Sequence, residues 1–123
     1  MSAIESILST DFHLVITDTE TTGIHALRNR IIEIAALRVK QGDPREIFSH
    51  LIDPGLSIPH RITRITGITS AMVFEQPTSE EIMPLYRDFL GDAIFVAHNI
   101  RFDLSFINAE FQRIGLEEMD NSG

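Results

Sequence analysis

An apolar, β-branched run near the N-terminus ends in two acids, and it constrains the fold more than any other feature of the sequence. The run extends from Phe12 to Thr17, and Asp18-Thr19-Glu20 follows it directly. Such a composition favours a short buried strand. Because side chains two apart on a strand share a face, Asp18 and Glu20 should present two carboxylates in the same direction.

A second apolar run carries a third acid to a comparable position. Ala93 to Ala97 predicts a short buried strand, and a helix is expected from about Ile100 to Arg113. Asp103 falls in the first turn of that helix, where the helix dipole also favours an acid. Three carboxylates from two elements would form a site for paired divalent ions, which can displace an oxygen at phosphorus.

The segments between these runs predict a meander and one further helix. Arg30 to Lys40 fits a strand or a helix by periodicity, but the turn signal Gln41-Gly42-Asp43-Pro44 and the strand-like Glu46 to Ile52 favour a hairpin. Asp53 to Thr69 predicts a long surface loop. Ser79 is expected to cap a helix that ends at Gly91. The order is β-β-β-α-β-α, which predicts an α/β fold with a mixed sheet.

Composition limits the domain count and raises one conflict. The chain has 123 residues, 43% of them hydrophobic, which is enough for one packed core. It has no cysteine, no secretory signal and no apolar run as long as a membrane span, so a cytoplasmic protein is expected. The net charge of −8 opposes strong nucleic-acid binding. Five arginines near the motifs could form a local phosphate-contacting rim or be solvated surface residues: Arg28, Arg30, Arg61, Arg64 and Arg101.

The acidic segments, read with their neighbours, resemble a known family. Asp18-Thr19-Glu20-Thr21-Thr22-Gly23 and His98-Asn99-Ile100-Arg101-Phe102-Asp103 are similar to the motifs of the DEDD superfamily of 3′-5′ exonucleases. The closest likeness is to the histidine-containing DEDDh branch, which includes the epsilon proofreading subunit of bacterial DNA polymerase III and its stand-alone relatives. It covers roughly residues 10 to 116. The resemblance implies a ribonuclease H-like mixed sheet and two-metal hydrolysis of phosphodiester bonds at nucleic-acid 3′ ends, with DNA favoured.

The resemblance also implies roles for individual residues. Asp18, Glu20 and Asp103 would be the catalytic acids and the ligands of two Mg²⁺ or Mn²⁺ ions. The residues expected to contact substrate are Thr21, Thr22, Gly23, Ile24, Thr66, Gly67, His98, Asn99 and Phe102. Two of these have an alternative role: Asn99 could cap the last helix, and Phe102 could belong to the core.

The sequence departs from the family at its third motif, His-x-x-x-x-Asp, which supplies the general base and a fourth carboxylate. The two strings that match, His13 to Asp18 and His98 to Asp103, end on acids that are already assigned. His13 would also lie about 16 Å from Asp18 on an extended strand. We therefore expect residues 1–123 to be the N-terminal part of a single exonuclease domain, inactive or weakly active alone, with its closing strand and helices absent after residue 123.

Two alternatives remain open at this point. One is a non-catalytic module that binds nucleic-acid ends or a polymerase partner, and the other is an RNA-directed exoribonuclease. The expected partners are nucleic-acid 3′ ends, in single-stranded or frayed DNA or in RNA, together with a polymerase or a second copy of the chain. A membrane is not expected.

Overall fold

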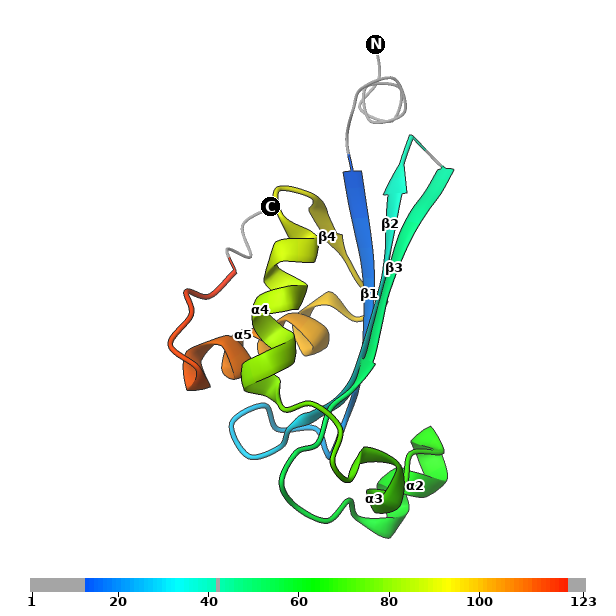
Figure 1. Cartoon of the computed structure of the whole chain (residues 1–123), viewed down its shortest axis with the longest axis vertical. Coiled ribbons are helices and arrows are strands. Elements are labelled where there is room, and N and C mark those ends of the chain that lie inside the picture. Colours follow the sequence, from blue (N-terminus) through cyan, green and yellow to red (C-terminus); the bar gives the residue numbers. More distant parts are fainter. Residues whose placement is uncertain (1–12, 42, 120–123) are drawn as a thin grey trace.

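A four-stranded mixed sheet carries the first acidic segment, and the second begins the helix that follows the last strand of this sheet (Figure 1). The computed structural model describes residues 13–41 and 43–119. Its elements are β1 (His13–Thr21), β2 (Ile31–Lys40), β3 (Asp43–Leu51), α2 (His60–Thr66), α3 (Ser70–Val73), α4 (Ser79–Leu90), β4 (Ile94–Val96) and α5 (Ile100–Arg113). The strand order is β3-β2-β1-β4.

The pairing of the strands confirms the predicted meander. β1 pairs antiparallel with β2, β2 pairs antiparallel with β3, and β4 joins β1 in parallel. A parallel pair requires a crossover connection, which the chain between β3 and β4 supplies through α2, α3 and α4. The mixed α/β architecture expected from the sequence is therefore present.

β1 alternates between two environments along its length. Val15, Thr17 and Thr19 are buried, whereas Ile16 and Asp18 are exposed. The buried face lies toward the helices, since the Thr17 hydroxyl is 2.7 Å from the Tyr86 hydroxyl on α4. Figure 1 shows α4 and α5 on the same side of the sheet. The main core lies between these helices and the sheet, and its buried members are Val15, Ile31, Ile34, Ala36, Ile52, Ile82, Met83, Tyr86, Leu90, Phe106, Ile107 and Phe111.

The stretch predicted as a surface loop, Asp53 to Thr69, contains the helix α2, and α3 begins directly after it, so that prediction was wrong. α2 and α3 lie beyond the end of β1 and β2 (Figure 1) and pack around a second small core on Ile32. A register shift between Glu20 and Thr21 of β1 allows Ile31 to enter the main core while Ile32 enters the second. The other buried residues of the second core are Ile58, Ile62, Ile68 and Val73.

The helix ends differ from the predictions in detail. α4 is preceded by Thr78 at the N-cap position, so Ser79 is its first residue rather than its cap. The buried Ser79 hydroxyl makes no hydrogen bond to any described residue. Asn99 does occupy the N-cap position of α5, but its side chain makes no capping bond. Within residues 13–41 and 43–119, no helix has both the length and the apolar character needed to cross a membrane.

Candidate active site

Thr19 joins the two acidic segments. Its hydroxyl donates a 2.5 Å hydrogen bond to Asp103 Oδ1, and its backbone N–H donates to the same oxygen at 3.2 Å. Asp103 is only 4% exposed. The first turn of α5 is therefore held against β1 between Asp18 and Glu20, although Thr19 and Asp103 are 84 residues apart in the sequence.

Asp18 and Glu20 occupy the other face of β1, together with an acid that the sequence did not indicate. Glu33 on β2 lies directly opposite Glu20 in the antiparallel register, so the two side chains share a face. Asp18 is exposed, whereas Glu20 and Glu33 are partly buried. Sequence reasoning missed Glu33 because only the strand register brings it to Glu20; the signal was an acid within the apolar run of residues 31–37.

The acids influence each other's ionisation. Partial burial raises the pKa of Glu20, and the charges of Asp18, Glu33 and Asp103 raise it further. Burial also raises the pKa of Asp103, because the hydrogen bonds from Thr19 offset that effect only in part, and Asp18 adds to it. The carboxylates thus form one negative region at the end of β1. A divalent cation would relieve their repulsion.

The donor set fits a hard divalent cation, but the side chains are not arranged around one. Carboxylate oxygens are the ligands that Mg²⁺ and Mn²⁺ prefer. Among the described residues, however, no three acidic or histidine side chains are gathered closely enough to hold an ion. Asp103 is bonded through Thr19 on one face of β1, while Asp18 and Glu20 lie on the other. Their role as joint metal ligands therefore stays a prediction.

The histidines of the two His-x-x-x-x-Asp matches, His13 and His98, do not lie between the three acids. His13 begins β1 and its Nδ1 lies 3.2 Å from Arg38 Nη1, at the opposite end of the strand from Glu20. His98 is exposed in the turn before α5. The structure gives neither of them the position of a base between the three acids.

The Thr21-Thr22-Gly23 segment is bonded mainly to its own loop. Thr22 donates its N–H to the Arg30 carbonyl at 2.9 Å, and its hydroxyl accepts from the Arg30 N–H at 3.0 Å. The Thr21 hydroxyl donates to the Gly23 carbonyl. A Cβ on Gly23 would lie 2.5 Å from Asn29 Oδ1, which explains the glycine. The Thr22 N–H is therefore already bonded within the loop, and contact of Thr21, Thr22 and Gly23 with substrate stays a prediction.

The other expected substrate residues divide into exposed and structural groups. Ile24, His98 and Asn99 are exposed and able to meet a ligand. Phe102 is half-buried and packs on Phe106 with ring centroids 4.9 Å apart, which favours the core role. Thr66 and Gly67 have evident structural roles at the end of α2, since the Thr66 hydroxyl donates to the Ile62 carbonyl and Gly67 has a φ of 80°.

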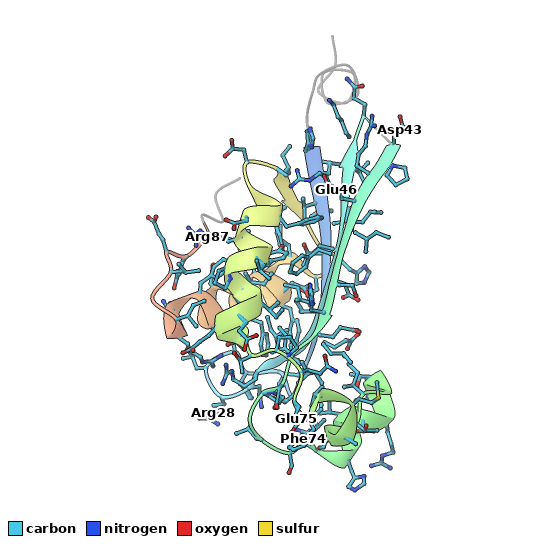
Figure 2. The ribbon with its side chains drawn as sticks, in the orientation of Figure 1. Arg28, Asp43, Glu46, Phe74, Glu75 and Arg87 are labelled. Atoms are coloured by element: carbon cyan, nitrogen blue, oxygen red, sulfur yellow. The ribbon has the colours of Figure 1, made fainter. Side chains whose placement is uncertain are left out.

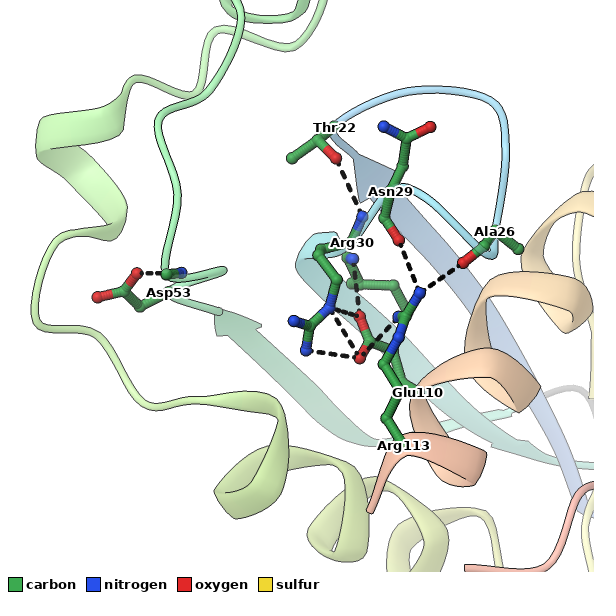
Figure 3. A network of polar contacts seen from close by, with 9 residues as sticks. Thr22, Ala26, Asn29, Arg30, Asp53, Glu110 and Arg113 are labelled. Atoms are coloured by element: carbon green, nitrogen blue, oxygen red, sulfur yellow. Dashed lines mark hydrogen bonds and ion pairs between the residues drawn. The ribbon is translucent and has the colours of Figure 1, made fainter. Parts of the chain in front are cut away.

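The five arginines differ in their surroundings. Arg28 lies on the loop between β1 and β2 and points away from the molecule (Figure 2). Arg61, Arg64 and Arg101 are also exposed. Arg30 is neither a free phosphate ligand nor a solvated residue, because its guanidinium is bonded to the buried Glu110 (Figure 3).

Comparison with known proteins identifies the family. A family model described as "Exonuclease" matches residues 15–122. The chain belongs to this exonuclease family. Members of the family depend on divalent metal ions, which agrees with the acidic region at the end of β1.

The relatives of this exonuclease chain include bacterial replication proteins. It is 42% identical over 111 residues to a DNA polymerase III PolC-type protein of Halalkalibacterium halodurans, covering 90% of this chain and 8% of that protein. It is 45% identical over 98 residues to the DNA polymerase III epsilon subunit of Aquifex aeolicus, covering 80% of this chain and 48% of that subunit. The chain therefore spans less than half the length of either relative.

Solved structures confirm the fold of this exonuclease chain. Exonuclease I in complex with an inhibitor matches with a TM-score of 0.81 and 19% identity, over 89% of this chain and 26% of that one. Escherichia coli exonuclease I in complex with a dA16 oligonucleotide matches with a TM-score of 0.80 and 19% identity, over 87% and 25%. The ribonuclease H-like mixed sheet implied by the family resemblance is therefore confirmed.

Replacing Glu20 with glutamine should stabilise the metal-free protein at pH 7.5. A folded-state pKa above the ordinary value means that the contribution of Glu20 to stability is most favourable at low pH and is lost as the pH rises through the raised pKa. The substitution removes that loss at pH 7.5 and should have little effect near pH 3.5, where Glu20 is protonated in both states. Urea unfolding of both proteins in a chelator at the two pH values measures this, and equal stabilities at pH 7.5 would contradict it.

Proposed function

We propose that this chain supplies the acidic part of a 3′-5′ exonuclease site that removes nucleotides from DNA 3′ ends. The main support for the proposal is the hydrogen bond from Thr19 to Asp103, because it brings together the two acidic segments, whose bonded residues are 84 positions apart in the sequence. Asp18 and Glu20 flank Thr19 directly. Acids from two elements, coupled in their ionisation, are what a site for metal-assisted phosphodiester hydrolysis requires.

Asp18, Glu20 and Asp103 would hold two ions, Mg²⁺ or Mn²⁺. When bound, such ions supply an activated water and stabilise the charge that develops on the leaving 3′ oxygen. Hydrolysis adds the elements of water across the P–O3′ bond, which yields a nucleoside 5′-monophosphate and a new 3′-hydroxyl end. Thr19 has a positioning part in this reaction, because its two bonds fix one oxygen of Asp103.

The proposed substrate is single-stranded or frayed DNA. Ile24, on the loop after β1, and the exposed His98 and Asn99 before α5 are the proposed contacts to the terminal nucleotide. Escherichia coli exonuclease I, which shares the fold, was solved with single-stranded DNA. The relatives in DNA polymerase III suggest proofreading beside a polymerase, and hence a cytoplasmic location.

We further propose that residues 1–123 act as the N-terminal part of one exonuclease domain. β4 pairs with β1 alone in the described sheet. The general base and the fourth acid that the family resemblance implies have no candidate beside Asp18, Glu20 and Asp103 among the described residues. The 123-residue chain alone should therefore be inactive or weakly active.

A 5′-labelled DNA oligonucleotide tests the proposed function. The chain, and any longer product of the same gene, would be incubated with the oligonucleotide in Mg²⁺, in Mn²⁺ and in a chelator. The proposal predicts metal-dependent shortening from the 3′ end, one nucleotide at a time, stronger in the longer product. A circular DNA of the same sequence is the control and should stay intact. Absence of shortening in both proteins, together with absence of Mn²⁺ binding, would contradict the proposal.

A non-catalytic end-binding module is the second candidate, and the separation of the acids on two faces of β1 favours it. It predicts that the same oligonucleotide binds at its 3′ end without being shortened in any metal. An RNA oligonucleotide of the same sequence, run in parallel, tests the exoribonuclease alternative. If RNA were shortened faster than DNA, the chain would be an RNA-directed exoribonuclease.

A further inference from the structure

Glu110 is a fully buried carboxylate on α5 that the proposed reaction does not use. It is 0% exposed, and both of its oxygens accept hydrogen bonds. Arg30 donates from Nη2 at 2.9 Å and from Nε at 3.0 Å, the Ile31 N–H donates at 3.1 Å, and Arg113 Nη1 lies 3.2 Å away (Figure 3). Burial alone would raise the pKa of Glu110, but these partners together lower it. The carboxylate is therefore charged and held from several directions.

The contacts around Glu110 are directed at the loop between β1 and β2. Arg113, itself paired with Glu110, donates from Nη2 to the Ala26 carbonyl at 2.7 Å and to the Asn29 carbonyl at 3.4 Å (Figure 3). Arg30 closes the loop, since its backbone forms the pair of hydrogen bonds with Thr22. The middle of the loop is thus tied to α5 by Arg113, which is paired with Glu110, and the end of the loop is tied to α5 by the Arg30–Glu110 pair.

This loop is the segment that leaves the acidic end of β1. It follows Glu20 and Thr21 directly, and its outer side chains are exposed, Ile24 at 75% and Leu27 at 84%. It contains neither helix nor strand between residues 22 and 30. Its conformation therefore depends on such individual contacts, and a shift in the loop would move Ile24 relative to Asp18 and Glu20.

We propose that Glu110 is a positioning residue, which fixes loop 22–30 through Arg30 and Arg113 so that Ile24 faces a terminal nucleotide bound at the acidic end of β1. The inference rests on the proposed function of that site. Stability alone does not explain the arrangement, since a buried ion pair is often no more stabilising than apolar residues of the same volume. Guanidinium groups bonded to a carboxylate at fixed geometry instead provide direction, and here they reach backbone carbonyls of the loop.

Two variants of the full chain test the inference. Glu110→Gln weakens the whole network, and Arg113→Gln removes the contacts to Ala26 and Asn29 while leaving the Arg30–Glu110 pair, in case the first variant does not fold. Ile82→Val, in the core on α4 and outside the network, controls for loss of stability. Three quantities are measured: the affinity for a fluorescent single-stranded DNA with a free 3′-hydroxyl, with Ca²⁺ as the only metal; the hydrogen exchange of loop amides; and the Mn²⁺ affinity.

The inference predicts about tenfold weaker binding of the DNA end and faster exchange of residues 22–30 in both network variants, with Mn²⁺ affinity within about twofold of wild type. Ile82→Val should change neither the end affinity nor the loop exchange. If the wild type binds the DNA end and Arg113→Gln binds it equally well, the positioning role is wrong and the proposed function survives. If the wild type binds no DNA end, the proposed function fails, and the inference fails with it.

Discussion

Replacing Asp103 with asparagine should lower exonuclease activity by on the order of 10³-fold, because metal ions contribute several kcal/mol to stabilising transition-state charge and each 1.36 kcal/mol is a factor of ten in rate. The substitution removes one negative charge from the site while leaving the fold intact. Asparagine Oδ1 can still accept the two hydrogen bonds from Thr19. Mn²⁺ affinity, measured by calorimetry on the chain, should fall together with the activity of the longest active product.

Asp88→Asn is the matched control for this prediction. Asp88 is an exposed acid on α4, and its replacement removes the same charge away from the end of β1. It should leave metal affinity and activity unchanged within the error of measurement. If Asp103→Asn bound Mn²⁺ as tightly as the wild type, Asp103 would not be a metal ligand and its buried position would be structural.

Replacing Phe106 with alanine should lower the free energy of unfolding by about 3–5 kcal/mol, the usual cost of removing a large buried side chain. Phe106 is 0% exposed and packs on Phe102 as part of the core between the helices and the sheet. Because Phe106 lies on the same helix as Asp103, the substitution should also loosen the contact between α5 and β1. Urea unfolding followed by circular dichroism measures the loss.

Phe74→Ala gives the same chemical change at the surface. Phe74 follows α3 and is 70% exposed, so its removal should change the free energy of unfolding by less than about 0.5 kcal/mol. Equal losses for the two variants would mean that α5 does not pack on the sheet as described.

The sequence was sufficient to predict the elements that carry the acids. A β-branched run delivers Asp18 and Glu20 to the end of β1, and a shorter run followed by a helical stripe places Asp103 in the first turn of α5. These are local patterns, whose period depends only on neighbouring residues. The same reasoning predicted the β2-β3 hairpin, because its turn signal is also local.

What the sequence could not supply depends on contacts between distant segments. α2 and α3 pack at the end of the sheet, where Ile58, Ile62 and Ile68 share a small core with Ile32. The loop-like composition of this stretch gave no sign of that contact with Ile32. The position of Glu33 beside Glu20 follows from a strand register that the sequence does not state. Glu110 shows the same limit, because its partners Arg30 and Ile31 lie about eighty residues earlier in the chain.

The central claim is tested most directly by the anomalous signal of manganese in a crystal soaked in Mn²⁺. The protein crystallised would be the longest product of the same gene that shows exonuclease activity. The account predicts manganese peaks at the end of β1, with oxygens of Asp18, Glu20 and Asp103 as ligands. Manganese absent from that position, or bound there without Asp103, would contradict it.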